Sequence, residues 1–433
     1  MKSIMDCLNY DDFGNLEIDS IKVSDISQKF ETPLYIMSEK KIRENCRKYI
    51  KASKKFFGNK FQILYASKAF SCKHMYKIIN EENLGTDVVS EGELFTALSS
   101  DFPTEKIYFH GNNKSYNELK MAVEKNVGKI IVDNIRELTL LNEISKEMKK
   151  ITNILIRIKP GVEAHTHEFI KTGVIDSKFG NDINSKECEE IIKNTRNMQN
   201  IKLIGLHCHI GSQIFSHEPF ELACEIMLKF IAKIKKEYNI KINELNLGGG
   251  FGVKYIKNDL NIQYENFIEK ISNKIFEVCE KFNVEHPKIL LEPGRSIVAN
   301  SGITVYTVGS IKNIPNVRKY VLVDGGMNDN PRYIMYGAKY EIIPVKTSFK
   351  KTQEKVTVAG KCCESGDIIS KNILIEPVKI NDQIAVLCTG AYNFSMASNY
   401  NRIPRLPVVM VSNGQLKLIV KRETLEDITK NDL

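Results

Sequence analysis

From Ile63 to about Arg295 the chain repeats one pattern of apolar and polar positions. A short apolar run rich in β-branched residues ends in glycine or a polar residue, and a stretch with helical spacing follows it. Strands that alternate with helices are joined by right-handed crossovers and form a parallel sheet. Repeated over this length, the pattern favours a closed (β/α)8 barrel, with an open doubly wound sheet as the alternative. The runs cover residues 63–67, 86–90, 107–111, 129–134, 154–159, 203–209, 244–250 and 289–295.

A different pattern begins at Ser301, where short alternating runs are separated by Gly, Asn and Asp. This is typical of antiparallel strands joined by turns, and 433 residues also exceed one typical domain. We therefore predict a barrel over residues 36–295. A mostly antiparallel β-sandwich or β-barrel domain would comprise residues 296–433 together with residues 1–35, which hold only short strand-like pieces. The strands predicted for it lie at 303–308, 319–323, 356–358, 383–387 and 416–420.

Polar residues and glycines gather where the predicted barrel strands end. In a (β/α)8 barrel the carboxyl ends of the strands meet at one rim, and active sites lie there. Several polar strand ends on one rim are hard to explain by packing alone, so we expect the active site at this rim. The residues are Lys68, Asp87, Arg157, His207, His209, Gly248–Gly250 and Glu292–Arg295.

Lys68 follows the apolar run Ile63–Ala66 almost directly. A lysine at the tip of a buried strand suggests an amine with a chemical role. The structural alternative is a lysine whose stem lies along apolar surface while its ammonium reaches water. The polar residues on the same predicted rim favour the chemical role.

A glycine-rich loop, Gly248–Gly252, follows the strand that ends at Leu247. Successive glycines let backbone N–H groups converge on an anion without interference from a Cβ atom, and barrels often bind phosphate after their late strands. Ser212 lies in a second small loop and offers a hydroxyl to the same anion. A tight turn is the structural alternative, and the spacing differs from a dinucleotide fingerprint.

His207 and His209 are two residues apart, so their side chains point to one face of the strand. A metal site would need further ligands, and no cysteine or carboxylate has convincing spacing, so we predict no metal. Stacking on a planar ring is one alternative, and a buried hydrogen-bonded histidine is another for His207. Glu292 and Arg295 would form a structural ion pair, or would bind a protonated ring nitrogen and an anion, respectively.

Three segments of the second domain are candidates for chemistry. Cys363, beside Glu364, is either a reactive thiol or part of the core. A polar, glycine-rich segment at 324–329 precedes Arg332 and Tyr336, and Gly390–Tyr392 ends another predicted strand. Either of these two segments could be a plain turn.

The formal charge of +9 comes mainly from lysines spread along helix faces, which indicates a solvated surface and no nucleic-acid site. No apolar run approaches a membrane span, and the N-terminus lacks the apolar centre of a signal peptide. Ten scattered cysteines without a CxxC pair indicate reduced thiols. We expect a cytoplasmic protein without a membrane or nucleic-acid partner.

Together and in this order, these segments resemble the fold-type III pyridoxal-phosphate decarboxylases, which have the alanine-racemase fold. Within that group they most resemble the diaminopimelate decarboxylases. The resemblance runs from about Pro33 to Thr424. It implies pyridoxal 5'-phosphate as cofactor, decarboxylation of meso-2,6-diaminopimelate to L-lysine and CO2, and a homodimer with shared sites. The motifs lie at 65–69 (YASKA), 87–94 (DVVSEGEL), 172–173 (TG) with 177–180 (SKFG), 207–213 (HCHIGSQ), 248–252 (GGGFG), 292–296 (EPGRS), 363–367 (CESGD) and 390–392 (GAY).

The resemblance also implies roles for single residues at the cofactor. Lys68 would bind it covalently, His209 would stack on its ring, and Glu292 would keep the ring nitrogen protonated. A supporting polar network would consist of Asp87, Glu93 and Arg157. The residues around the phosphate would be Ser212, Gly249, Gly250, Gly294, Arg295 and Tyr392.

Other residues would face the substrate. By the same resemblance, its distal end would be held by Arg295, Arg332 and Tyr336, with Tyr392 and Glu364 nearby. Cys363 would donate the proton that replaces CO2, and it would reach the site together with Glu364 from the partner subunit.

Four departures from the family pattern bear on the substrate. The family usually has proline at the positions of Lys361 and Tyr333, arginine at the position of Ile403 and glutamate at the position of Val408. Decarboxylation of ornithine, lysine, arginine or carboxynorspermidine is therefore the alternative. Glu364 directly after Cys363, together with Arg332, favours diaminopimelate. A racemase is disfavoured by the Cys363 segment, and a non-catalytic regulator by the intact set of Lys68, His209, Glu292 and Cys363.

Overall fold

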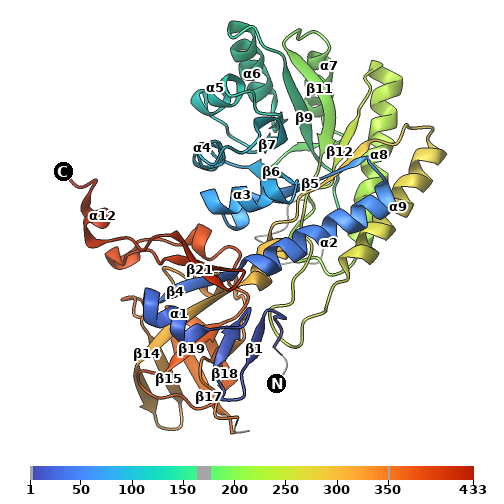
Figure 1. Ribbon diagram of the computed structural model, residues 1–433. Coiled ribbons are helices and arrows are strands. Elements are labelled where there is room, and N and C mark those ends of the chain that lie inside the picture. Colours follow the sequence, from blue (N-terminus) through green and yellow to red (C-terminus); the bar gives the residue numbers. More distant parts are fainter. Residues whose placement is uncertain (1–2, 163–176, 350–351) are drawn as a thin grey trace. The chain divides into compact units, whose positions relative to one another are not determined.

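The computed structural model describes residues 3–162, 177–349 and 352–433 (Figure 1). The chain forms two compact units. The barrel unit comprises Cys46–Gly252 and Ile262–Gly294, and the β-rich unit comprises Met1–Asn45, Val253–Asn261 and Arg295–Leu433. Residues 36–45, residues 253–261 and Arg295 thus lie with the β-rich unit, although the sequence pattern placed them in the barrel. Thr172 and Gly173 of the quoted motifs lie outside the described residues.

All eight apolar runs form parallel strands of one closed barrel. Each strand pairs with the next, and the ring closes where β13 pairs with β5, Ile289 lying opposite Phe61. The predicted closed barrel is therefore confirmed, and the open-sheet alternative is wrong. The strands are β5 (Phe61–Ala66), β6 (Gly85–Val88), β7 (Ile107–Phe109), β8 (Lys129–Val132), β9 (Thr152–Lys159), β11 (Ile201–His207), β12 (Glu244–Asn246) and β13 (Lys288–Leu291), with the short β10 (Asn181–Asp182) beside β9.

Apolar side chains fill the barrel interior. A cluster of five, none more than 1% exposed, comes from five different strands, and burying each such side chain stabilises the fold by about 2 kcal/mol. The interior is therefore a packed core, which leaves the strand ends as the place for chemistry. The five residues are Leu64, Tyr108, Ile131, Leu155 and Leu290.

Helix α2 precedes the first barrel strand and the other helices lie between barrel strands, and several begin at a side-chain cap. Ser90, Asn134 and Ser185 each accept a hydrogen bond from the backbone N–H three residues ahead, which satisfies an otherwise unpaired donor. Ser115 and Glu118 form a reciprocal capping box. The helices are α2 (Glu39–Phe57), α3 (Lys73–Glu81), α4 (Glu91–Leu98), α5 (Tyr116–Glu124), α6 (Ile135–Glu147), α7 (Lys186–Thr195), α8 (Glu218–Tyr238) and α9 (Tyr264–Lys281).

Helix α8 supports the glycine-rich loop. Its Phe220 ring stacks on Phe251 of that loop, with ring centroids 5.0 Å apart and planes 8° from parallel. Phe267 of α9 contacts both rings edge-on. Since aromatic packing of this kind fixes orientation as well as burying area, the loop after β12 has a rigid base.

The β-rich unit contains all five strands predicted after Ser301. They are β14 (Gly302–Ile314), β15 (Arg318–Val323), β17 (Glu354–Ala359), β19 (Gln383–Val386) and β21 (Gln415–Val420). The sheet has the order β18-β17-β15-β14-β4-β20-β21, with β19 pairing β14 and β16. Most pairs are antiparallel, as predicted, but β15–β17 and β4–β20 are parallel.

The N-terminal residues divide between two sheets. A three-stranded sheet consists of β1 (Leu8–Tyr10), β2 (Leu16–Ile18) and β3 (Ile21–Lys22), whereas β4 (Leu34–Ser38) lies between β14 and β20. The remaining elements of the unit are β16 (Ile342–Pro344), β18 (Ile368–Ile375), β20 (Val408–Ser412), α1 (Val23–Phe30), α10 (Arg295–Val298), α11 (Arg332–Tyr336) and α12 (Leu425–Thr429). Among the described residues, no helix is both long and apolar enough to cross a membrane.

Candidate active site

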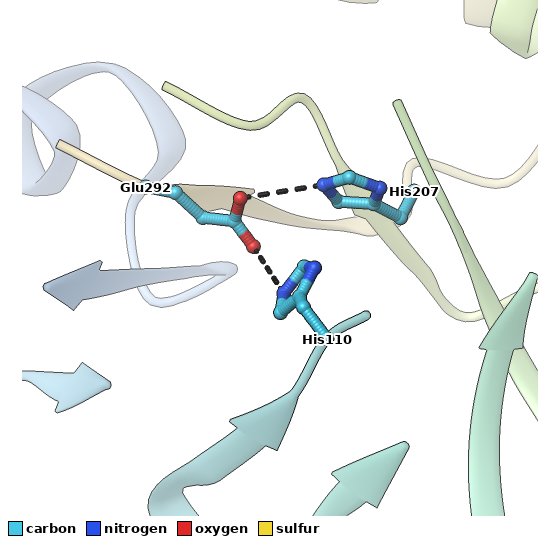
Figure 2. A group of neighbouring side chains, drawn as sticks. All are labelled: His110, His207 and Glu292. Carbon is cyan, nitrogen blue, oxygen red and sulfur yellow. Dashed lines mark hydrogen bonds and ion pairs between the residues drawn. The ribbon is translucent and has the colours of Figure 1, made fainter. Parts of the chain in front are cut away.

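Glu292, directly after β13, is a buried carboxylate surrounded by polar side chains (Figure 2). His110 Nε2 lies 2.9 Å from its Oε1, and His207 Nε2 lies 3.3 Å from its Oε2. Asn246 donates from Nδ2 to Oε1 over 2.7 Å. The three neighbours come from the ends of β7, β11 and β12, so the barrel rim brings together residues far apart in sequence.

The protonation states in this cluster follow from burial and from these contacts. Burial lowers the pKa of His110, and it lowers that of His207 to about 4, so both imidazoles are neutral near pH 7. Burial alone would raise the pKa of Glu292, but its two histidine neighbours outweigh burial and hold that pKa well below its usual value. Glu292 is therefore an ionised carboxylate.

The ligand atoms of His110, His207 and Glu292 all lie within 4.8 Å of one another, a grouping whose composition also suits a metal ion. The donors already directed at both carboxylate oxygens favour a hydrogen-bonded cluster, because a carboxylate that accepts N–H groups is stabilised without a cation.

Asn246 connects this carboxylate to the glycine-rich loop. Its Oδ1 accepts the backbone N–H of Gly248 over 2.9 Å while its Nδ2 holds Glu292. A Cβ atom on Gly249 would lie 2.1 Å from the carbonyl oxygen of Glu292, and one on Gly250 would lie 2.3 Å from that of Gly211. The loop packs so closely on its neighbours that only glycine fits at these positions.

The loop that carries Ser212 runs beside the glycine loop. Ile214 and Phe251 form a parallel bridge, and the N–H of Ile214 donates to the carbonyl of Gly250 over 2.9 Å. His209 joins the same region, because its Nδ1 accepts the N–H of Gly249 over 3.2 Å. Burial lowers the pKa of His209 well below its usual value, so its ring is neutral. The loop that carries Ser212, the glycine loop and the His209 ring thus lie beside one another.

Lys68 lies in the short turn that follows β5, with an exposed side chain. The residue before it is held on two sides: Ser67 N–H donates to Asp87 over 3.2 Å, and the Ser67 hydroxyl donates to Glu93 over 2.6 Å. Burial, and then the charge of Glu292, raise the pKa of Asp87 well above its usual value. Asp87 and Glu93 therefore hold Ser67 and with it the turn that carries Lys68.

Arg157, the third member of the predicted network, lies at the end of β9. Its guanidinium packs 4.4 Å from the centre of the Phe179 ring, and its Nε is 4.0 Å from Asp133. Gly294 packs against β5, where an added Cβ atom would come within 2.7 Å of Ala66. The barrel unit thus contains Lys68, Asp87, Arg157, His209, Ser212, Gly249, Gly250, Glu292 and Gly294.

The remaining predicted residues lie in the β-rich unit. Arg295 donates to the Tyr255 hydroxyl over 2.9 Å and lies 4.6 Å from the centre of the Tyr392 ring. Arg332 donates to the Tyr340 hydroxyl over 2.6 Å and packs 5.0 Å from the centre of the Tyr255 ring. The two arginines are 8% and 6% exposed, respectively, so tyrosines hold two buried cations together. Tyr336, which ends α11, is partly buried.

Cys363 and Glu364 are exposed on a turn that Asp367 organises. The Asp367 carboxylate accepts the backbone N–H groups of Cys362 and Met327, each over 2.7 Å. Cys362 is buried, and burial raises the pKa of its thiol to about 11. Of the two adjacent thiols, Cys363 is therefore the accessible one.

Four residues with evident roles were not among the predicted site residues: His110, Asn246, Tyr255 and Tyr340. His110 and Asn246 lie within the strand-end runs 107–111 and 244–250, so their position was a usable signal. Tyr255 and Tyr340 carried no such signal, because neither follows a predicted strand.

Comparison with known proteins agrees with this geometry. Residues 39–299 match the family model "Pyridoxal-dependent decarboxylase, pyridoxal binding domain". Diaminopimelate decarboxylase of Bacillus subtilis (strain 168) is 47% identical over 97% of this chain and 95% of its own length. That of Staphylococcus aureus (strain COL) is 43% identical over 98% of this chain and 99% of its own.

This chain belongs to the diaminopimelate decarboxylase family. A solved structure agrees: diaminopimelate decarboxylase from M. jannaschii in complex with L-lysine has a TM-score of 0.92 and 37% sequence identity, covering 100% of this chain and 99% of that one. The fold-type III resemblance and its cofactor, pyridoxal 5'-phosphate, are thereby confirmed.

The residues present fit this cofactor. The closely packed glycine loop after β12 leaves backbone free of side chains beside the loop that carries Ser212, which suits a phosphate, and Glu292 is an ionised acceptor for a protonated ring nitrogen. The planar His209 ring and the Lys68 amine complete the set of groups that the cofactor requires.

Proposed function

We propose that this diaminopimelate decarboxylase family member converts meso-2,6-diaminopimelate to L-lysine and CO2. The observation that carries the proposal is the similarity to diaminopimelate decarboxylases over nearly the whole chain. Arg332 supports it as well. Diaminopimelate differs from lysine by a second carboxylate at its far end, and the buried Arg332 forms no ion pair with a carboxylate in the described parts of the chain. A buried guanidinium of this kind suits a ligand carboxylate.

The chemistry follows from the residues. When bound, pyridoxal phosphate supplies a sink for the electron pair left at Cα as CO2 departs. Lys68 binds the cofactor through its amine, His209 orients the ring, and Glu292 holds a proton at the ring nitrogen. The Cys363 thiol donates a proton to Cα, so that a C–H bond replaces the broken C–C bond, and the thiolate recovers a proton from water.

We further propose a homodimer in which Cys363 and Glu364 complete the site of the partner subunit. The support is their exposure on an organised turn, where both can reach beyond their own chain. Mixing Lys68→Ala with Cys363→Ala protein tests this, since each variant alone is impaired. Random subunit exchange should restore about one quarter of wild-type turnover, because half of the dimers then hold one intact site. No recovery in a mixture shown to exchange subunits would contradict the shared site.

The assay that tests the substrate measures CO2 release from diaminopimelate, lysine, ornithine, arginine and carboxynorspermidine. We expect kcat/KM for diaminopimelate to exceed every other value by at least about 100-fold, because the site would pair a buried cation with its distal carboxylate. Faster release from another compound would contradict the proposal. Lys68→Ala serves as the control, since it should release no CO2 and should lack the bound-cofactor absorption band.

We also assign the enzyme to the cytoplasm, where a small amino-acid substrate would be met. None of the ten cysteines forms a disulfide in the described residues, which suits a reducing compartment.

A further inference from the structure

Glu292, which faces the cofactor ring in the proposed function, also contacts several polar side chains of its own chain. His110 Nε2 approaches one oxygen of Glu292 and His207 Nε2 the other, and each histidine follows or ends a different barrel strand (Figure 2). The histidines are 5% and 1% exposed, respectively, and their rings meet edge-on with centroids 4.8 Å apart. Both rings are therefore held in place by the fold.

We propose that His110 and His207 are positioning residues that fix the orientation and charge of Glu292, His207 through its Nε2–H group and His110 through the close approach of its Nε2 to Oε1. Asn246 adds a third donor and ties the carboxylate to the loop expected to bind the phosphate. The Asn246 side chain thereby connects the carboxylate expected at the ring nitrogen with the loop expected at the phosphate. This inference rests on the proposed function, because it concerns the group that Glu292 binds.

The tautomer of His207 follows from its surroundings. With the proton on Nε2, the ring donates to Glu292, and Nδ1 is a buried acceptor that has no hydrogen-bond partner in the described residues. The other tautomer would direct a lone pair at the carboxylate and would bury an N–H group instead. An unpaired buried N–H is rarer in folded proteins than an under-used acceptor, so the Nε2–H form is favoured.

Neutral donors suit this task better than a cation would. A lysine or arginine beside Glu292 would form an ion pair and compete with the protonated ring nitrogen for the carboxylate. Two imidazoles and an amide stabilise the negative charge and leave it available to one further donor.

The test uses holoenzyme carrying ¹⁵N-labelled pyridoxal phosphate and records the ring-nitrogen chemical shift, which reports protonation of that nitrogen. Glu292→Gln supplies the reference for a ring without its carboxylate. In the double variant His110→Leu/His207→Leu the shift should move toward that reference, and cofactor affinity should fall about 10- to 100-fold, as when supporting residues around other cofactor sites are removed.

Rescue separates positioning from packing. In His110→Gln/His207→Gln each amide can donate from a position similar to Nε2, so the shift should return toward the wild-type value. His286→Leu, a partly buried histidine after α9, should leave the shift unchanged. If the double leucine variant does not fold, the single His110→Leu variant is measured instead, with a smaller shift expected.

The outcomes separate this inference from the proposed function. A wild-type ring-nitrogen shift that persists in folded leucine variants would overturn the inference while leaving the decarboxylase intact. A wild-type protein that binds no pyridoxal phosphate would overturn both.

Discussion

Two buried carboxyl groups, one in each unit, are kept in opposite states. Glu292 in the barrel unit is 6% exposed and Asp329 in the β-rich unit is 1% exposed. The pKa of Glu292 is held well below its usual value by two histidines despite burial. Burial raises the pKa of Asp329 to about 7, although its carboxyl accepts hydrogen bonds from the Tyr306 hydroxyl and the Gly326 N–H.

The difference shows that the kind of partner, more than the depth of burial, decides the charge of a buried carboxyl. Three side-chain nitrogens lie at the Glu292 carboxylate, two from imidazoles and one from an amide, whereas Asp329 accepts from one phenol and one backbone amide. Asp367 and Asp324 near Asp329 add repulsion, which raises the pKa of Asp329 further. The barrel unit thus keeps an ionised carboxylate, and the β-rich unit keeps a carboxyl that holds its proton over a wider pH range.

Replacing Glu292 by glutamine should have the largest effect. The amide cannot hold a positive ring nitrogen, so kcat should fall about 10²- to 10³-fold, as when one preorganised electrostatic contact is removed, while bound cofactor remains visible by absorbance. Glu244→Gln is the matched control, since Glu244 is also buried but begins β12 beside Tyr108. Equal losses of kcat in the two variants would remove the special role of Glu292.

Much of the barrel unit and of its candidate site could be predicted from the sequence. The eight strand ends, and with them Lys68, Glu292 and the glycine loop, follow from periodicity and from where polar residues interrupt it. His110 was inside a predicted run but was not chosen, because a polar residue at a strand end does not reveal which distant side chain it meets. Such meetings depend on barrel closure, a long-range property.

The β-rich unit was less predictable for a related reason. Strand β18 is interrupted by Ser370, Lys371 and Asn372, and β20 is apolar without alternation, so neither showed a strand period. The pairing of β4 with β20 joins residues at opposite ends of the sequence, which no local pattern encodes. Arg295 and Arg332 likewise contact tyrosines, Tyr255 and Tyr340, that no local sequence pattern marked as site residues.

Replacing Arg332 by methionine tests the buried cation of the β-rich unit. We expect KM for diaminopimelate to rise about 30- to 100-fold through loss of a charged hydrogen bond, while KM for a substrate without a distal carboxylate changes little. Arg318→Met is the control, because Arg318 also donates to a tyrosine hydroxyl, that of Tyr320, but on β15. A similar rise for all substrates would show that Arg332 supports the fold and not the substrate.

Replacing Asp329 by asparagine tests whether the buried carboxyl of the β-rich unit holds its proton. In the folded chain the carboxyl holds its proton up to about pH 7, whereas its ordinary pKa is 3.8, so unfolding releases a proton within that window. Its contribution to stability is therefore complete below about pH 4 and is lost as the pH rises toward 7. The difference in unfolding free energy between wild type and Asp329→Asn should shrink by about 2 kcal/mol from pH 5 to pH 7.

Denaturant unfolding at each pH measures this difference. Asp382→Asn, at an exposed position of the same unit, is the control and should leave the pH dependence as it is. If the difference in unfolding free energy between wild type and Asp329→Asn stays constant from pH 5 to pH 7, Asp329 is ionised in the folded chain. The contrast with Glu292 would then fail.

Tyr340→Phe should give the smallest effect, because it removes one hydroxyl and keeps the ring that packs on Tyr255. Arg332 loses the acceptor at 2.6 Å and with it part of its orientation, so KM for diaminopimelate should rise about 3- to 10-fold at unchanged kcat. Tyr320→Phe, which removes the acceptor of Arg318, should leave KM unchanged. A fall in kcat instead of a rise in KM would mean that the Tyr340 hydroxyl takes part in the chemistry, and the β-rich unit would then supply more than substrate binding.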